Sequence, residues 1–359
     1  EWRQRMGGNP RRAELERIFA GEAPADLKIS WFSAEEKPMA TRAASGKVIA
    51  EVAPQVPEMV GGSADLTPSN NTKPADWTDF EPGHPEGRYL RFGVREHGMG
   101  GVVNGLVVSH LRAFGATFFN FLDYMKPAVR LSALMNIPAV WVYTHDSVGL
   151  GEDGPTHQPI EQLATLRATP NMTVFRPADA NETAVGWRIA LTRRNPTALV
   201  LTRQALPVLD ADAMPVADAA RGGYVLEGDD DPAVLLIATG SEVHTALEAR
   251  RLLSQEGTTS RVVSLPSWEL FDEQPQSYRD DVIPPAVQAR VCVEAAATLG
   301  WERFAGSRGA IVGLDRFGAS APGATVLEQL GFTPRHVADE ALRVLSVIRE
   351  GGIIHDQTA

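Results

Sequence analysis

Cysteine is nearly absent from this sequence. Its 359 residues include one cysteine, Cys292, which lies in the apolar run 289–293, so a disulfide framework is excluded and a buried, reduced thiol is expected. A chain without disulfides fits a cytoplasmic protein. No apolar run is long enough to span a bilayer, and no signal-peptide pattern opens the chain.

Positive charge is also in short supply. The chain carries 34 lysine and arginine residues against 45 aspartate and glutamate residues, which gives a formal net charge of -11. Nucleic acids and anionic membranes would repel such a surface, so neither is expected as a partner. Any arginine at a binding site therefore needs its own explanation.

The length exceeds what one hydrophobic core usually supports, and predicted strands and helices alternate along it. This pattern predicts an α/β protein with two consecutive doubly wound domains. Residues 41–205 form the first, with a mainly parallel sheet, and residues 232–359 form the second and smaller one. Residues 1–40 and 206–231 have the proline, glycine and charge content of linkers. The chain opens with Glu1, so we expect it to continue a longer polypeptide.

The densest group of polar residues is the loop 143–159. An apolar strand (139–143) precedes it and an amphipathic helix (160–169) follows it, so the loop lies at the carboxyl edge of the predicted sheet, where ligands bind. Its titratable residues are His145, Asp146, Glu152, Asp153 and His157. They suit hydroxyl recognition and proton transfer. A solvated connector is the alternative, and the wide histidine spacing disfavours a metal site.

Three more stretches reach the same predicted edge. Asp65 and Ser69 follow the strand in 59–64, and Glu96 begins a helix after the strand in 89–93. The carboxylate of Glu96 has either a functional role or only the role of an acid that stabilises the start of a helix. A third set, Phe118, Phe121 and Tyr124, has a spacing typical of core packing. In the second domain, residues 239–242 could cradle a phosphate at a helix start, but Ser241 is rather expected to be a plain helix cap.

Together these stretches resemble one family, the transketolases, which use thiamine diphosphate. The resemblance is carried by residues 61–66, 93–96, 117–124, 144–159, 201–204 and 315–322, and it extends from about Arg42 to the end of the chain. It implies the family's pyrimidine-binding and C-terminal domains. The family's N-terminal domain binds the diphosphate and Mg or Ca through a Gly-Asp-Gly motif followed by Asn, and no such motif occurs here. Residues 1–40 are similar to the segment that joins that domain to the next.

The resemblance implies a site for thiamine diphosphate. Glu96 would hydrogen-bond the aminopyrimidine ring and promote removal of the thiazolium proton. The three aromatic residues, Phe118, Phe121 and Tyr124, would surround the pyrimidine, and Asp65 would lie near the cofactor. The implied reaction transfers a two-carbon ketol unit from a ketose phosphate to an aldose phosphate, in the pentose phosphate pathway.

The resemblance also implies sugar-phosphate contacts. His157 would move the proton of a donor hydroxyl, and Asp153 would recognise the neighbouring hydroxyl. The residues implied for the terminal phosphate are Arg42, Ser69, His145 and Arg203. From its position alone, Arg203 reads as a surface arginine that ends a strand. No metal ligand is expected in this chain.

The implied partners are the diphosphate-binding domain, on the same or a separate chain, and a second copy in a homodimer. Two alternatives remain open. One is another thiamine enzyme of the same layout, such as a 2-oxo acid dehydrogenase beta subunit or a deoxyxylulose-phosphate synthase, although those lack this loop. The other is a non-catalytic half-enzyme module.

Overall fold

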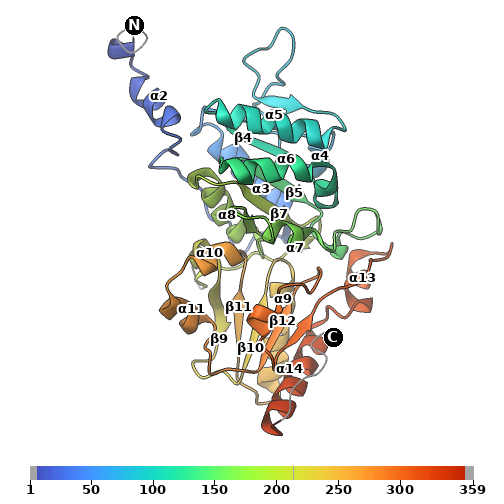
Figure 1. Cartoon of the computed structure of the whole chain (residues 1–359). Coiled ribbons are helices and arrows are strands. Elements are labelled where there is room, and N and C mark those ends of the chain that lie inside the picture. The colour runs from blue at the N-terminus through green and yellow to red at the C-terminus, as the bar shows by residue number, and fades with distance from the viewer. Residues whose placement is uncertain (1–5, 213, 352–359) are drawn as a thin grey trace.

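The computed structural model describes residues 6–212 and 214–351. Two α/β domains follow one another along the long axis of the molecule, the first in blue and green and the second in yellow to red (Figure 1). Residues 1–5 and 352–359, the outer ends of the first and last predicted ranges, lie outside the described part. The α/β fold class predicted from the sequence is confirmed.

The first domain is built on a parallel sheet whose strands occur in the order β3-β2-β4-β5-β7-β6. These strands are β2 (Met59–Ser63), β3 (Tyr89–Arg91), β4 (Arg112–Phe118), β5 (Val140–Thr144), β6 (Thr173–Phe175) and β7 (Thr197–Leu201). Every residue of β4, β5 and β7 is buried. A sheet that is covered on both faces explains why these strands read as continuous apolar runs.

Helices cover both faces of this sheet. They are α3 (Thr41–Val52), α4 (Thr67–Asn70), α5 (Glu96–Val108), η2 (Phe119–Phe121), α6 (Leu122–Met135), η3 (Val148–Leu150), α7 (Gln162–Arg167) and α8 (Ala180–Thr192). Alternate residues of β5 join different clusters. Val140 and Val142 pack with α3 and α8, whereas Trp141 and Tyr143 pack with α5 and α6. Both sides of the sheet therefore carry their own core.

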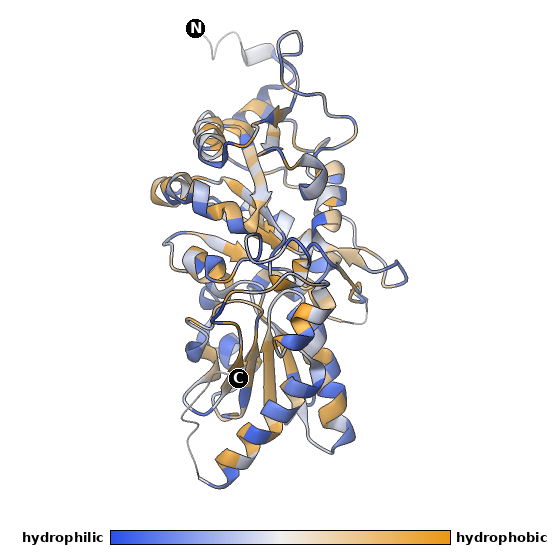
Figure 2. Ribbon diagram, turned by 90° about the vertical axis from the view of Figure 1, so that its right-hand side faces the viewer, coloured by the Kyte–Doolittle hydropathy of each residue, from blue (hydrophilic) through white to orange (hydrophobic). Residues whose placement is uncertain are grey.

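The second domain has a mixed sheet in the order β13-β12-β10-β11-β9. Its strands are β9 (Tyr224–Gly228), β10 (Val234–Ala238), β11 (Ser260–Ser264), β12 (Arg290–Val293) and β13 (Ala310–Val312). Its helices are η4 (Val216–Arg221), α9 (Glu242–Gln255), α10 (Trp268–Asp272), α11 (Gln276–Val282), α12 (Glu302–Ala305), α13 (Gly323–Gln329) and α14 (Pro334–Arg349). Figure 2 shows apolar strands at the centre and alternating polar and apolar bands on the long outer helix.

The structure departs from the sequence expectation in this domain. Strand β9 falls within 206–231, which reads as a linker, and it pairs antiparallel with β11 as the edge of the sheet. Helices α10 and α11 are separate elements. Pro275 stands directly before α11, and a proline cannot donate the backbone hydrogen bond that a continuous helix would need there.

The segment before the first domain is attached at both of its ends. Helix α2 (Arg12–Phe19) has no buried residues, but its Arg17 guanidinium lies 2.7 Å from the buried carboxylate of Glu58. Farther along, β1 (Met39–Ala40) pairs antiparallel with β8 (Ala205–Leu206). This pair joins the start of the first domain to its end.

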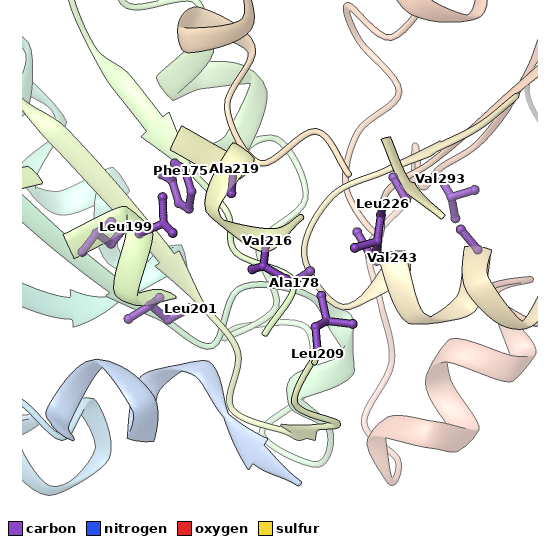
Figure 3. Packing of buried hydrophobic residues seen from close by; sticks show 14 of the residues in the cluster. Phe175, Ala178, Leu199, Leu201, Leu209, Val216, Ala219, Leu226, Val243 and Val293 are labelled. Atoms are coloured by element: carbon purple, nitrogen blue, oxygen red, sulfur yellow. The ribbon is translucent and has the colours of Figure 1, made fainter. Parts of the chain in front are cut away.

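The two domains share one apolar core. A single cluster of buried side chains includes Leu199 and Leu201 from the first sheet and Val293 from the second. Figure 3 shows Val216 and Ala219, from the connection between the domains, lying between these two groups. The shared core makes independent movement of the domains costly.

A buried arginine crosses the same junction. Arg176 follows β6, is completely buried, and donates hydrogen bonds to Asp146 over 2.7 and 2.9 Å. Its other nitrogen donates to Thr239 and Glu242 in the second domain. Burial would lower the pKa of Arg176, but the neighbouring carboxylates raise it above its ordinary value. The guanidinium therefore stays charged inside the junction.

Arg167 makes a second ionic link between the domains. Its guanidinium donates to both carboxylate oxygens of Glu294 over 2.7 and 2.8 Å and lies 3.8 Å from the ring centroid of Trp268. Trp301 donates its indole N–H to the same carboxylate over 2.8 Å. Burial opposes ionisation, but Arg167 and Arg176 lower the pKa of Glu294 to about 2.

A third polar contact at the junction centres on Glu182 of α8. Its carboxylate accepts hydrogen bonds from the Tyr224 and Ser264 hydroxyls over 2.8 and 2.6 Å and from the backbone N–H of Ala178 over 2.7 Å. Burial, and then the charge of Asp179, raises the pKa of Glu182 to about 7. This carboxyl is therefore neutral in the folded protein at mildly acidic pH.

The raised pKa of Glu182 makes stability depend on pH. The folded protein holds this proton more tightly than the unfolded chain, so the stabilisation is complete below the unfolded pKa of about 4.3 and is lost as pH rises through about 7. In Glu182→Gln the amide can donate to the two hydroxyls without titrating. We expect the difference in melting temperature, wild type minus variant, to fall steadily between pH 5 and 8.

The matched control is Glu161→Gln, which changes an exposed acid of the same domain. Thermal unfolding followed by circular dichroism at several pH values gives the comparison. A difference between wild type and Glu182→Gln that does not change with pH would contradict the assignment.

Candidate functional site

The candidate site lies at the carboxyl edge of the first sheet, where β2, β4, β5 and β7 all end. The strands are parallel and nearly in register, so the residues that follow them meet at one place. Those residues are Asp65 and Ser69 after β2, Phe118 and Phe121 at and after the end of β4, His145 after β5 and Arg203 after β7.

A chain of hydrogen bonds runs across the ends of β2 and β5. The Ser63 hydroxyl donates to Asn70 over 2.6 Å, and the Asn70 amide donates to the Thr144 hydroxyl over 2.8 Å. Thr144 lies 2.9 Å from Nδ1 of His145. Because the Thr144 oxygen already accepts from Asn70, its own proton is free for Nδ1. This arrangement favours the histidine tautomer that carries its proton on Nε2.

His145 is held in an unusual conformation and is neutral. Its φ of 64° lies in the left-handed region, and its side chain packs on Phe118 with ring centroids 3.8 Å apart. Burial, followed by the positive charges of Arg42 and Arg203, lowers the pKa of His145 to about 3. The imidazole is therefore a neutral hydrogen-bond group at physiological pH.

The aromatic residues form a continuous row with the second loop histidine. Phe121 lies 5.7 Å from Phe118 and 5.8 Å from Tyr124 between ring centroids, and His157 lies 5.3 Å from Phe121. Phe118 is buried, Phe121 is partly buried, and Tyr124 is 66% exposed. An exposed aromatic ring at the end of such a row is suited to contact a planar ligand.

The two arginines form a like-charged pair. The pKa of Arg42 is lowered by burial and then by the charge of Arg203, and only Asp153 acts in the opposite direction. Arg42 donates to the backbone carbonyl of Ser69 over 2.7 Å, so the carbonyl rather than the hydroxyl makes this contact. Two guanidinium groups that repel each other beside a neutral histidine favour an anion between them.

The other two acids expected at this edge of the sheet are Glu96 and Asp65. Glu96 begins α5 and is 7% exposed. Within residues 6–212 and 214–351, the carboxylates of Glu96 and Asp65 form no hydrogen bond or ion pair. Asp65 is exposed and has a φ of 61°. A buried carboxylate without a partner is costly, so Glu96 is suited to receive a donor from a bound group. The residues present therefore fit a cofactor with a protonated ring nitrogen.

Two other expectations were wrong. The carboxylate of Asp146 does not face the site, because it pairs with Arg176 at the domain junction. Ser241 does not cap α9 with its side chain, since its hydroxyl donates to Glu242 and accepts from Gln204. Sequence reasoning also missed Asn70 and Thr144, although Thr144 lies in a stretch that resembles the family.

Residues 6–212 and 214–351 contain no group of three or more histidine, cysteine, aspartate or glutamate side chains that could hold a metal ion. Within the same residues, no helix is both long and apolar enough to cross a membrane. Cys292 is buried on β12, as expected, and burial raises the pKa of its thiol.

Fold and site together define a two-domain α/β protein whose candidate site lies at the carboxyl edge of the first, parallel sheet. Residues 37–208 match the model of the transketolase pyrimidine binding domain, and residues 222–333 match that of the transketolase-like C-terminal domain. The chain belongs to the transketolase family.

Individual relatives agree with this assignment. Over 331 residues the chain is 50% identical to a transketolase of Geobacillus stearothermophilus, covering 90% of this chain and 50% of that protein. The structure of Pichia stipitis transketolase in complex with sedoheptulose-7-phosphate superimposes with a TM-score of 0.90 at 41% identity, covering 97% of this chain and 52% of the other. The chain thus spans about half the length of these relatives.

A third relative is closer to this chain in length. It is described as a split gene transketolase, an inactive beta4 tetramer, and it superimposes with a TM-score of 0.71 at 29% identity. The match covers 86% of this chain and 99% of that one.

The paired arginines predict anion binding by the chain itself. Replacing Arg203 with alanine removes one charge-assisted contact, so inorganic phosphate should bind more weakly by about 1.5 to 3 kcal/mol. Isothermal titration calorimetry or phosphate-induced NMR shifts would measure the change.

Arg194→Ala is the control, since Arg194 is an exposed arginine before the opposite end of β7. It should bind phosphate as the wild type does. Equal phosphate affinity in all three proteins would rule out this site.

Proposed function

We propose that this chain supplies the pyrimidine-binding half of a transketolase active site. The reaction transfers a two-carbon ketol unit from a ketose phosphate to an aldose phosphate. Thiamine diphosphate, when bound, supplies the nucleophilic carbon that carries the two-carbon unit from donor to acceptor. The chain's own residues would bind the pyrimidine, orient the sugar and move protons.

The observation that carries the proposal is the row from His145 through Phe118 and Phe121 to Tyr124, next to a cationic pair. One end of this row is exposed and aromatic, as a planar ring would require. At the other end the buried His145 is accompanied by two positive side chains, the half-buried Arg42 and the exposed Arg203, as a phosphate would require.

Each residue then has a defined task. Glu96, a buried carboxylate at a helix start, would hydrogen-bond a pyrimidine ring nitrogen. His157 would take or return the proton of a donor hydroxyl, and Asp153 would accept a hydrogen bond from the hydroxyl beside it. Neutral His145 would donate from Nε2, since its Nδ1 is engaged with Thr144. Arg42 and Arg203 would hold the terminal phosphate.

The donor class follows from the relatives as well as from the charges. A related transketolase, from Pichia stipitis, is described in complex with sedoheptulose-7-phosphate. The sugar hydroxyls of such a ketose phosphate suit Asp153 and His157, and its phosphate suits the arginine pair. The pentose phosphate pathway is the setting that this substrate class implies.

The same site needs groups from another domain. A diphosphate requires a divalent cation such as Mg or Ca, held by hard oxygen ligands. We propose that a diphosphate-binding domain provides them, either within a longer polypeptide or as a separate chain, as the split-gene relative suggests. We also place the protein in the cytoplasm, in keeping with its single reduced cysteine.

An exposed apolar face beside the site supports docking of that domain and of a second copy in a homodimer. Val94, Val102 and Leu134, on or next to α5 and α6, are 76%, 45% and 67% exposed. On the same helix, a Cβ added at Gly101 or Gly105 would meet nothing within 4 Å. A smooth apolar face next to Glu96 suits a tightly fitting protein surface.

The two alternative functions, another thiamine enzyme and a non-catalytic module, are less well supported, for different reasons. Another thiamine enzyme of the same layout fits less well, since the relatives named transketolase reach 50% identity. A non-catalytic module would not need a buried carboxylate without a partner or a repelling arginine pair. Comparing a ketose phosphate with pyruvate as donor separates the two enzyme classes.

Glu96→Gln tests the proposed proton chemistry. An amide cannot share a proton with the ring nitrogen as a carboxyl can, so exchange of the thiazolium proton in the complemented enzyme should slow by at least about 100-fold. Deuterium exchange followed by proton NMR measures this rate directly. The fold should be retained, because the carboxylate has no partner among the described residues to lose. Exchange at the wild-type rate would refute the role.

Complementation tests the whole proposal. Residues 1–359 alone should show no ketol transfer. Adding the half of the Geobacillus stearothermophilus transketolase that this chain does not match, with thiamine diphosphate and magnesium, should restore it. That half alone and the mixture with Glu96→Gln are the controls. Turnover by residues 1–359 in a preparation of verified mass would show that the chain needs no complement.

A further inference from the structure

A segment of the second domain lies against the site loop of the first. This segment, residues 316–323, follows β13 and leads into α13, and we call it the clasp segment. Figure 1 shows α13 beside the loop that follows β5, and α13 packs on the short helix η3 within that loop. The two segments are far apart in the sequence, so their contact is a property of the fold.

Gln158 ties the clasp segment to two points of the loop. Its side chain is 2% exposed, and Nε2 lies 3.2 Å from the carbonyls of Val148 and Gly151 and 3.0 Å from that of Ala319. A single buried amide thus links the beginning and the middle of the loop to the second domain. Since all three acceptors are backbone carbonyls, the contact constrains the path of the chain.

Ser320 makes a second tie. Its hydroxyl donates to the carbonyl of Glu152 over 2.6 Å. The next residue in the loop is Asp153, and the turn continues through Gly154, whose carbonyl accepts from the backbone N–H of His157 over 3.0 Å. Ser320 therefore holds the turn on which both proposed sugar-binding residues stand.

The two segments approach too closely to admit side chains. A Cβ on Gly323 would lie 2.3 Å from the carbonyl oxygen of Gly149, and one on Gly318 would lie 2.0 Å from Oε1 of Gln158. Gly151 and Gly154 have φ values of 98° and 77°, which residues with side chains rarely adopt. The glycines of the loop and of the clasp segment thus form one fitted contact.

We propose that Ser320 and Gln158 are positioning residues, and that the clasp segment fixes the loop so that Asp153 and His157 face the donor sugar. This gives the second domain a part in substrate recognition, and it rests on the proposed function for its enzymatic consequences. Neither residue touches the substrate. Both act through the backbone of residues 148–157.

Two variants release the loop in different ways. Ser320→Ala removes one hydrogen bond, and Gly318→Ala forces the Gln158 amide out of place. Ser307→Ala, an exposed serine of the same domain, is the control. In residues 1–359 without any addition, hydrogen–deuterium exchange of peptides covering residues 148–157 should be faster in both variants than in the control. Peptides from β4 and β10 should exchange as in the wild type.

The complemented enzyme shows the consequence for recognition. Loss of one neutral hydrogen bond should raise KM for a ketose phosphate by about threefold to tenfold. The KM for hydroxypyruvate should not change, because that donor lacks the hydroxyl that Asp153 would recognise. A merely structural role would instead reduce turnover of both donors equally with KM unchanged, and that result would overturn the proposal.

The exchange measurement needs no turnover. It therefore separates failure of this proposal from failure of the proposed function. Unchanged exchange in both Ser320→Ala and Gly318→Ala would refute the positioning role whatever the kinetics. Faster exchange confined to the loop would support it even in a protein that shows no ketol transfer.

Discussion

The structure depends on one buried cation, the guanidinium of Arg176. In the second sheet the chain reverses its winding between β10 and β12, and the carboxyl ends of those strands form the crevice where such sheets bind ligands. Thr239 and Glu242 follow β10, and Glu294 follows β12. Arg176 of the first domain occupies this crevice, in the place of a ligand. The second domain therefore uses its binding edge to hold the first.

This arrangement reaches the candidate site through Asp146. Removing one member of a buried ionic group leaves an uncompensated charge, at a cost of about 3 to 5 kcal/mol, whereas replacing the whole group by apolar residues can be neutral. The group is thus better understood as fixing geometry than as adding stability. Asp146 is bound to Arg176 and is adjacent to His145, so the junction also sets where the loop leaves β5. The contact between Arg176 and Asp146 therefore constrains both the position of the domains and the geometry of the loop at the candidate site.

Sequence patterns predicted what depends on local order and missed what depends on tertiary contact. Buried strands such as β5 are continuous apolar runs, and the carboxyl-edge rule then places His145 and Arg203 near each other. The edge strand β9 was missed because its residues mix charge, glycine and apolar side chains, and only pairing with β11 makes it a strand. Asp146 was assigned to the site because a loop sequence does not show which way a carboxylate points. The spacing of Phe118 and Tyr124 indicated core packing for both, which holds for Phe118 and fails for the exposed Tyr124.

The two ends of the site differ in how they are built. At the end proposed for the phosphate, a hydrogen-bond chain runs from Ser63 to His145 beside the like-charged Arg42 and Arg203, so this chain alone brings together the groups proposed to hold an anion. At the other end, Glu96 lacks a partner among the described residues and Tyr124 is open to solvent, so the proposed cofactor and partner domain would supply the missing contacts there. An enzyme assembled from two halves, as we propose, would gain from this division. The groups proposed to recognise the sugar phosphate would be in place before assembly, and the site proposed for the cofactor would be completed when the partner covers the apolar face of α5 and α6.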